Sequence, residues 1–116
     1  MIRSESGLQK ACVRWFDDNI SLTQAFLFSV PNGGSRHKLE AINLKKEGLK
    51  AGVADLVLLL AGGTTVFIEL KYGKNGQSVK QREFECLVKK LGFNYYIIRT
   101  FNEFKDVVGY FLTDKL

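Results

Sequence analysis

The sequence predicts one α/β domain in which helices cover both sides of a sheet. Two observations predict this fold class. Helical and strand patterns follow one another in the order α-β-α-β-β-α-β-α, and two neighbouring strands are apolar on both faces, as in Leu56 to Leu60. Such strands belong in the middle of a sheet with helices on either side. A chain of 116 residues, 46% of them hydrophobic, can build one core but not two, so we expect a single domain.

Four segments have helical periodicity. From Glu5 to Asn19 the apolar residues recur at i, i+3, i+4, i+7 and i+8, and at 100° per residue Glu5 itself projects into that apolar stripe. A weaker helix runs from Lys38 to Glu47, a third from Ser78 to Leu91, and Asn102 is expected to cap the last. The buried face of the third helix is expected to contain Phe84, Leu87, Val88 and Leu91.

Four strands are expected between these helices: Ala25 to Val30, Ala54 to Leu60, Thr65 to Lys71 and Asn94 to Arg99. Gly62-Gly63 predicts a hairpin between the second and the third. In the last strand Tyr95 and Tyr96 are interpreted as core residues, with stacking on nucleic-acid bases as the alternative.

Charge and cysteine usage limit the possible functions. The chain has 17 Lys and Arg against 12 Asp and Glu, a formal net charge of +5, which suits an anionic partner such as nucleic acid, although many small basic proteins bind none. Cys12 and Cys86 form no C-x-x-C pair, which favours a reduced cytoplasmic protein. Because the sequence has no secretory leader and no apolar run of about 18 residues, we expect neither export nor a membrane partner.

Asp55 and Glu69 are unexpected inside strands that otherwise look buried. An ionised carboxylate without a partner costs several kcal/mol away from water, so these acids must be paired, bound to a metal or placed at strand ends. The register of the hairpin decides whether they can meet. A plain two-residue turn would place them on opposite faces, whereas a three-residue or five-residue loop, or one bulge, would place Asp55 on the same face as Glu69 and Lys71.

The residues around these acids suggest metal chemistry. Asp55 begins one strand, Glu69-Leu70-Lys71 ends its partner, and a basic loop then leads to a helix that opens with Gln81. Two carboxylates and a backbone carbonyl are suitable ligands for Mg²⁺, and a lysine beside them can orient a water and stabilise charge on a phosphoryl group. An E-x-K triplet taken alone fits equally well with a strand that ends in two solvated residues.

Several short segments together carry a resemblance to a known family. They are Gly52-Val53-Ala54-Asp55-Leu56, Ile68-Glu69-Leu70-Lys71, Ser78-Val79-Lys80-Gln81, and the loop Pro31-Asn32-Gly33-Gly34 with Arg36. This set resembles the PD-(D/E)xK nuclease superfamily and, within it, the VRR-NUC (virus-type replication-repair nuclease) family. One position departs from the motif, because Ala54 stands where its leading proline is expected. The proline does no chemistry there, and the three charged positions are intact.

The resemblance implies a restriction-endonuclease-like αβββαβ core with a mixed central sheet, and an extra helix, from Lys38, between the first two strands. It further implies that Asp55, Glu69 and the Leu70 carbonyl bind the metal and that Lys71 is catalytic. Glu5 would reach the metal directly or through water; alternatively it is an acid that the N-terminal helix dipole stabilises. Gln81 would orient Lys71 or a metal-bound water; alternatively it only closes a capping box with Ser78.

By the same resemblance the chain would be a Mg²⁺-dependent, structure-selective DNA endonuclease, with Mn²⁺ able to substitute. It would hydrolyse phosphodiesters through a metal-activated water in branched DNA such as Holliday junctions, acting as a homodimer in the cytoplasm of a bacterium or a phage-infected host. The alternative is a non-catalytic DNA-binding module that retains the fold. Large apolar residues from Phe101 to Leu112 could form the dimer interface or close the core. Candidate phosphate contacts, each also compatible with an ordinary solvated surface, are Arg36, Lys38, Lys74, Lys80 and Arg82.

Overall fold

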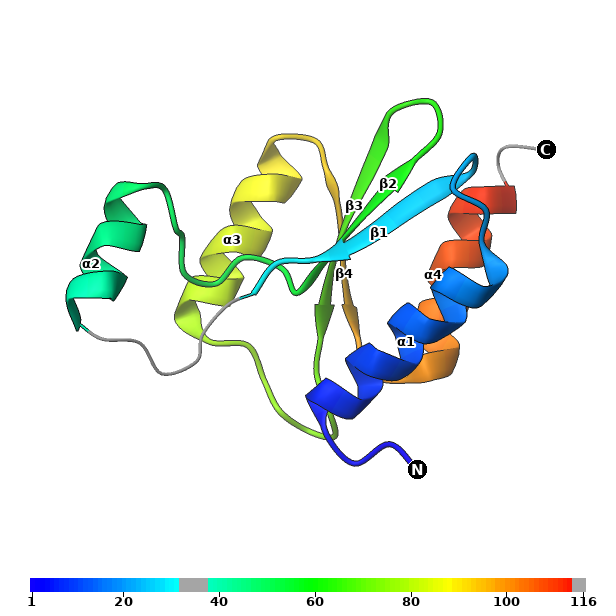
Figure 1. Ribbon diagram of the computed structural model, residues 1–116, viewed down its shortest axis with the longest axis horizontal. Helices are drawn as coiled ribbons and strands as arrows, with labels where there is room; N and C mark the ends of the chain where they lie inside the picture. The colour runs from blue at the N-terminus through cyan, green and yellow to red at the C-terminus, as the bar shows by residue number, and fades with distance from the viewer. Residues whose placement is uncertain (32–37, 114–116) are drawn as a thin grey trace.

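The computed structural model describes residues 1–31 and 38–113. The predicted order of helices and strands is confirmed, and the αβββαβ core is present with one helix, α2, inserted after the first strand (Figure 1). None of the helices in the described part of the chain is long and apolar enough to cross a membrane. The elements are α1 (Glu5–Asn19), β1 (Ala25–Ser29), α2 (Lys38–Lys46), β2 (Leu56–Leu60), β3 (Thr64–Leu70), α3 (Val79–Lys90), β4 (Asn94–Ile98) and α4 (Phe101–Thr113).

The four strands form one mixed sheet in the order β1-β2-β3-β4. β1 is antiparallel to β2 and β2 to β3, whereas β4 runs parallel to β3 after the crossover through α3. The two strands that are apolar on both faces, β2 and β3, therefore lie in the middle of the sheet, as predicted.

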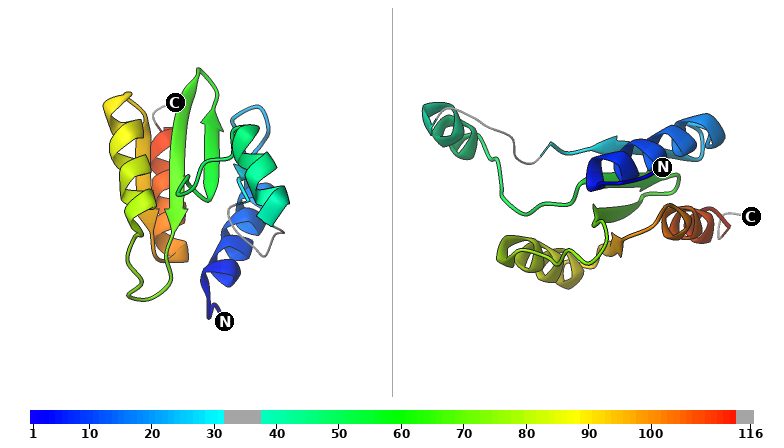
Figure 2. Two further views of the ribbon diagram at one scale, coloured as in Figure 1. Left: turned by 90° about the vertical axis from the view of Figure 1, so that its left-hand side faces the viewer. Right: turned by 90° about the horizontal axis from the view of Figure 1, so that it is seen from below.

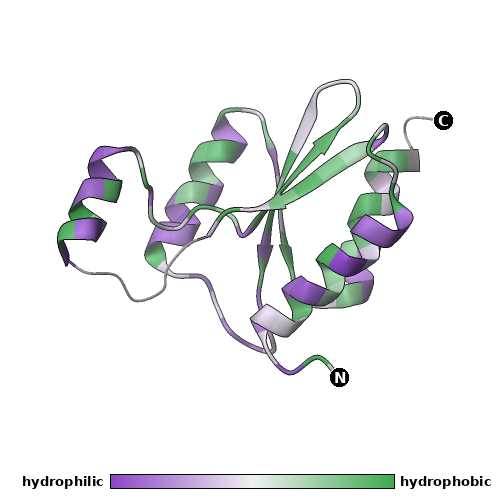
Figure 3. Ribbon diagram, in the orientation of Figure 1, coloured by the Kyte–Doolittle hydropathy of each residue, from purple (hydrophilic) through white to green (hydrophobic). Residues whose placement is uncertain are grey.

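The main core lies on the face of the sheet that α1 and α4 cover (Figure 2). Alternate strand residues such as Leu58 and Ile68 meet Phe16 of α1 and Phe104 of α4 there. The opposite face is covered by α3, which packs against β4, and Ala54, Val88 and Tyr95 are its buried residues. Hydropathy follows this division, because the strands are apolar over most of their length while the helices alternate between apolar and polar residues (Figure 3).

The prediction for the buried face of α3 is wrong at two positions. Val88 is buried, but Leu87 and Leu91 are 54% and 63% exposed. The helix packs mainly against β4 and reaches Phe67 of β3, so one narrow row of its side chains meets the sheet. For the same reason Phe26 and Leu59, on the part of this face that belongs to β1 and β2, remain exposed.

α2 stands apart from the sheet at one end of the long axis of the molecule (Figure 1). None of the residues of this helix is buried, which agrees with the weak periodicity of its sequence. It is an insertion between β1 and β2 and contributes nothing to either core cluster.

The β2–β3 hairpin has the odd register that the acids require. Leu60 pairs with Thr64 and Leu56 with Ile68, which leaves a loop of three residues, 61–63. Gly62 and Gly63 have φ values of 95° and 98°, a region that glycine enters without strain. The pairing ends at Leu56 and Ile68, and continuing it by one residue sets Asp55 opposite Glu69 at the same end of the sheet.

The N-cap of α4 is Thr100 and not Asn102 as predicted. The Thr100 hydroxyl accepts a hydrogen bond from the Glu103 N–H at 3.1 Å, and the Glu103 carboxylate accepts one from the Thr100 N–H at 2.9 Å. This reciprocal pair is a capping box, which satisfies two backbone N–H groups at the start of the helix. The apolar residues of α4 mostly close the core, since Phe104 is buried and Phe101, Phe111 and Leu112 pack against it.

The two cysteines should differ sharply in reactivity. Cys12 is fully buried in the core and burial raises the pKa of its thiol to about 12, whereas Cys86 is exposed on α3. Because the thiolate is the reactive form, Ellman's reagent at pH 8 should label one thiol in the native protein and two in denaturant. Rapid labelling of both thiols in the native protein would contradict this packing of α1.

Candidate active site

The predicted site residues gather at the end of the sheet where β3 finishes, between the N-termini of α1 and α3. Two cavities meet there, and Glu5 and Asp55 line both. One, of about 820 Å³, runs between α1 and β1. The other, of about 420 Å³, lies between Asp55, Gln81 and the segment that joins α2 to β2. Asp55 is thus reached from two sides of the domain.

Asp55 is held by the backbone of both neighbouring strands. Its Oδ2 accepts a hydrogen bond from the Leu70 N–H at 2.7 Å, and its carbonyl accepts one from the Val30 N–H at 2.9 Å. Since the N–H and C=O of one strand residue point to the same edge, the Leu70 carbonyl also faces the Asp55 side. The sequence-predicted ligand set of Asp55, Glu69 and Leu70 is therefore brought together.

Burial raises the pKa of Asp55, and the negative charges of Glu69 and Glu5 raise it further. The Leu70 N–H and the Lys71 ammonium act in the opposite direction. The electrostatic surroundings of Asp55 are thus those of a cluster of carboxylates with one nearby cation. Such a cluster favours the binding of a positive charge at its centre.

Glu69 is 1% exposed, and its two oxygens differ. Oε1 accepts a hydrogen bond from the Tyr95 hydroxyl, whereas Oε2 has no hydrogen-bond partner among the described residues. A buried carboxylate oxygen without a partner costs free energy, and native structures rarely contain one unless an ion or a water binds there. Lys71, two residues further along the same face, is 7% exposed.

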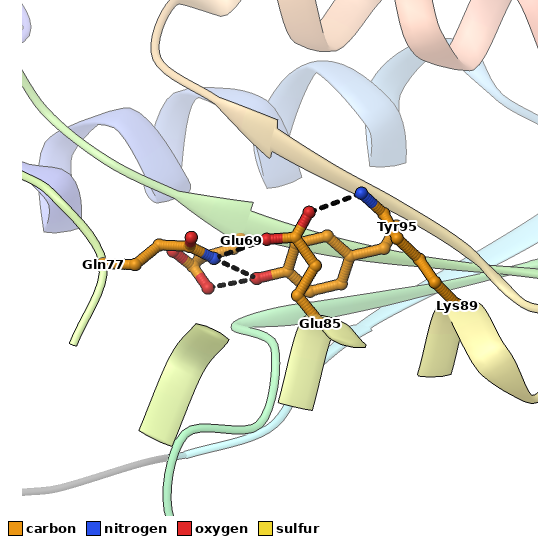
Figure 4. Close-up of polar contacts among 5 residues, drawn as sticks. All are labelled: Glu69, Gln77, Glu85, Lys89 and Tyr95. Carbon is orange, nitrogen blue, oxygen red and sulfur yellow. Dashed lines mark hydrogen bonds and ion pairs between the residues drawn. The ribbon is translucent and has the colours of Figure 1, made fainter. Parts of the chain in front are cut away.

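A chain of hydrogen bonds connects Glu69 with the surface of α3 (Figure 4). The Gln77 amide nitrogen donates to the Tyr95 hydroxyl at 3.3 Å and to Glu85 Oε1 at 2.9 Å, and Glu85 Oε2 accepts from Lys89 at 2.5 Å. The bond from Lys89 lowers the pKa of Glu85, with a smaller contribution from Gln77 in the same direction. Burial and the bond to Glu69 raise the pKa of Tyr95, so its hydroxyl stays protonated.

Glu5 and Gln81 lie beside the site and also have structural roles. Glu5 is the first residue of α1, half-buried, with Oε2 accepting a hydrogen bond from the Asn75 side chain at 3.4 Å. Gln81 closes the predicted capping box with Ser78, in which both reciprocal bonds are present. The capping role of Gln81 is confirmed. Because Glu5 and Gln81 also line the cavities at Asp55, their structural roles do not exclude a role in the site.

The loop that follows Lys71 is fixed by Arg99 at the end of β4. One guanidinium nitrogen of Arg99 donates to the carbonyls of Gly73 and Asn75, each at 2.9 Å. Arg82 of α3 donates to the Gln77 carbonyl at 2.9 Å. These contacts hold the backbone between Lys71 and α3 without using the loop's own side chains.

The candidate phosphate contacts are only partly brought together. Lys74, Lys80 and Arg82 are exposed in the loop and first turn of α3 that border the site, whereas Lys38 lies on α2, away from the sheet. Arg36 lies outside the described residues, as does most of the Pro31–Gly34 loop. Two further lysines, Lys45 and Lys50, line the smaller cavity with Glu5 and Asp55, and sequence reasoning missed them.

Sequence reasoning also missed Tyr95, Gln77, Glu85 and Arg99. Tyr95 pairs with Phe67 in the parallel β3–β4 ladder, which places it on the same face as Glu69. The position of Tyr95 beside Glu69 depends on the register between β3 and β4. Because these two strands are joined through a helix, no turn residue in the sequence predicts that register. The apolar surroundings of Tyr95 predict a core residue, which is correct for its ring and not for its hydroxyl.

In the described part of the chain, no three His, Cys, Asp or Glu side chains converge in the way a closed metal site needs. A cation at this place would have two carboxylates, a backbone carbonyl and water as ligands. Mg²⁺ commonly binds with few carboxylates and retains several waters, so this donor set suits it better than zinc.

The arrangement of the mixed sheet and its covering helices is shared with solved structures. A solved VRR_NUC domain protein matches with a TM-score of 0.76 and 18% identity, over 97% of this chain and 91% of its own. A solved VRR_NUC domain matches with a TM-score of 0.63 and 18% identity, over 91% of this chain and 96% of its own. No protein-family model and no curated protein matches the sequence. The chain therefore has the fold of VRR_NUC domains, which confirms at the level of fold the resemblance drawn from its motifs.

Gly52 should be essential for the approach of the Asp55 segment to α3. Its φ is 79°, and a Cβ atom there would lie 2.4 Å from the carbonyl carbon and 2.5 Å from the oxygen of Lys80. Gly52→Ala should lower the free energy of unfolding by about 2–3 kcal/mol, measured by urea denaturation. Gly109→Ala is the control, because a Cβ in α4 meets nothing within 4 Å. Equal stability of both variants and the wild type would contradict the close contact.

Asp55→Asn should stabilise the metal-free protein. A raised pKa means that the folded state binds the proton more tightly, so ionised Asp55 lowers the free energy of unfolding as pH rises above the usual carboxyl range. Asparagine keeps the acceptor for the Leu70 N–H and carries no charge. In EDTA the variant should melt higher than the wild type at pH 7.5, and the two should converge at acidic pH. A change of about 1 kcal/mol moves the melting temperature by roughly 4–8 °C, which is readily measured.

Proposed function

We propose that this chain is a Mg²⁺-dependent nuclease that hydrolyses phosphodiester bonds in DNA at the centre formed by Asp55, Glu69 and Lys71. The observation that carries the proposal is Glu69 Oε2, which is buried without a hydrogen-bond partner among the described residues and belongs to a carboxylate close enough to raise the pKa of Asp55. A carboxylate oxygen in that state fits a cation ligand better than a structural role. The fold shared with VRR_NUC domains supports the reaction class.

The residues present fit Mg²⁺. Asp55, Glu69 and the Leu70 carbonyl would hold it, and Glu5 is suitably placed to bind one of its waters. A bound Mg²⁺ would activate a water and neutralise charge on the phosphate. Mn²⁺, which accepts the same oxygen ligands, should substitute.

Lys71 would supply positive charge to the phosphate under attack. It lies on the same face as Glu69, largely buried, where an ammonium interacts more strongly with a developing charge than it does in water. Gln81 would orient a water or Lys71 through the hydrogen-bonding capacity of its amide that the capping box does not use. The N-termini of α1 and α3 both lie at the site, and their partial positive charge favours a bound phosphate.

DNA binding follows from the charge of the surrounding residues. Lys45 and Lys50 line the smaller cavity, and Lys74, Lys80 and Arg82 are exposed at its border. Together with the net charge of +5, they would contact the backbone on either side of the cleaved bond. This binding should weaken steeply as salt concentration rises.

We extend the proposal to branched DNA such as four-way junctions, and to a homodimer, because two symmetric cuts need two sites related by a two-fold axis. The sequence resemblance to structure-selective nucleases motivates this choice. Exposed apolar residues on β1 and β2, among them Phe26, Phe28 and Leu59, would provide the contact surface more readily than α4, whose large residues mostly fill the core. Sedimentation equilibrium of the protein with and without junction DNA tests the dimer.

Labelled four-way junction and matching linear duplex should be incubated with the protein in Mg²⁺ or in EDTA. We expect cleavage of the junction in Mg²⁺ and none in EDTA. Lys71→Met should cut at least about 100-fold more slowly, because it retains the length of the side chain and removes the charge. Lys90→Met, at the opposite end of α3, is the matched control and should retain full activity.

The remaining outcomes distinguish the catalytic mechanism, the preference for branched DNA and cleavage itself. Undiminished cutting in EDTA, or by Lys71→Met, would refute the mechanism. Equal cutting of duplex and junction would retain the nuclease and refute the preference for branches. Binding of DNA with no cleavage in Mg²⁺ or Mn²⁺ would favour the non-catalytic DNA-binding module.

A further inference from the structure

The hydrogen bonds in Figure 4 can run in one direction only. Glu85 accepts from Lys89 with one oxygen and from Gln77 with the other, and an ionised carboxylate cannot donate. The Gln77 amide must therefore present its nitrogen to Glu85, because the flipped amide would set oxygen against oxygen. The same nitrogen then donates to the Tyr95 hydroxyl.

This arrangement fixes the proton of Tyr95. A phenol hydroxyl has one proton, and an amide nitrogen can only donate to it. The Tyr95 proton therefore points to Glu69 Oε1, the only other polar atom to which the hydroxyl is bonded among the described residues. Oε1 accepts the Tyr95 hydrogen bond, whereas the buried Oε2 has no hydrogen-bond partner in the part of the chain that the structure describes. Glu69 consequently has two inequivalent oxygens before any ligand binds.

We propose that Tyr95 is a positioning residue that makes Glu69 bind its cation through Oε2 alone, and that Gln77 and Glu85 hold the tyrosine hydroxyl in the donating orientation. This inference rests on the proposed function, since it concerns the same cation. It adds a basis for selectivity among metals. A carboxylate restricted to one oxygen suits the small octahedral Mg²⁺ and Mn²⁺, whereas Ca²⁺ readily accepts a carboxylate through both oxygens.

Tyr95→Phe tests this role, because it removes the hydroxyl and retains the ring that packs in the smaller core cluster. Titration calorimetry with Mn²⁺ alone and with Ca²⁺ alone gives the two affinities without DNA or turnover. We expect Mn²⁺ affinity to fall by about 10-fold to 100-fold. Ca²⁺ affinity should fall less or rise, because Glu69 is then free to bind through both oxygens. The ratio of the two affinities is the readout, since a general loss of packing would lower both equally.

Two further variants provide the control and an independent route to the same effect. Tyr96→Phe is matched in chemistry and adjacent in sequence, but Tyr96 lies on the other face of the sheet, against Phe111, and its variant should bind both metals as the wild type does. Glu85 lies three hydrogen bonds away from Glu69, and Glu85→Gln removes the constraint on the Gln77 amide. It should change the Mn²⁺ to Ca²⁺ ratio in the same direction as Tyr95→Phe, by a smaller factor.

The outcomes distinguish this inference from the proposed function. If Tyr95→Phe retains the wild-type ratio of affinities, the role of Tyr95 is refuted, whether or not the protein is a nuclease. An equal loss for both metals would likewise refute it and indicate a packing role. If the wild type binds neither metal, the proposed metal-dependent function is refuted, and the role of Tyr95 is refuted with it. Asp55→Asn should abolish binding and thereby locate the measured site.

Discussion

The structure depends on the register of one hairpin. Side chains alternate between the faces of a strand, so a shift of one residue in the β2–β3 pairing would turn Glu69 and Lys71 to the other side of the sheet. The three-residue loop that contains Gly62 and Gly63 prevents that shift. A slip of β3 by one residue would also turn Glu69 towards the core that α1 and α4 cover, where a charge without a partner is costly. The same hydrophobic burial that stabilises the domain thus holds the two carboxylates together.

The location of the site has a cost in stability. Burial raises the pKa of Asp55, and Glu69 has an oxygen with no partner among the described residues. Neither feature stabilises the metal-free chain. The surrounding contacts compensate: the Leu70 N–H holds Asp55, Tyr95 holds Glu69, and Arg99 fixes the loop beyond Lys71. Strain and unsatisfied groups of this kind concentrate where a protein binds a ligand.

Most of the fold could be predicted from the sequence, because its signals are local. The amphipathic stripe of α1 gives that helix with its observed bounds, and the capping box at Ser78 and Gln81 marks the start of α3. The charged triplet at the end of β3 and the acid before β2 indicate the centre of the site. How far a helix extends across the sheet could not be predicted in this way. The exposure of Leu87 and Leu91 depends on how far α3 extends across the sheet, and no periodicity in its own sequence reports that.

The residues around the site show the same limit. Tyr95 belongs to a parallel ladder whose register is set through a helix, and Gln77, Glu85 and Arg99 act through side-chain contacts between elements that are distant in sequence. Residue type alone favours Asn102 as the cap of α4, whereas the reciprocal bonds of Thr100 and Glu103 satisfy two backbone N–H groups. Charged motifs therefore indicate a candidate site, and tertiary packing decides which residues surround it.

Asp55 and Glu69 are proposed to bind one divalent cation between them. The most direct measurement is an anomalous difference map from a crystal of the protein soaked in Mn²⁺, collected near the manganese absorption edge. We predict a single strong peak in contact with Asp55, Glu69 Oε2 and the Leu70 carbonyl. A map with no peak at these residues, or with its strongest peak elsewhere in the molecule, would contradict the account.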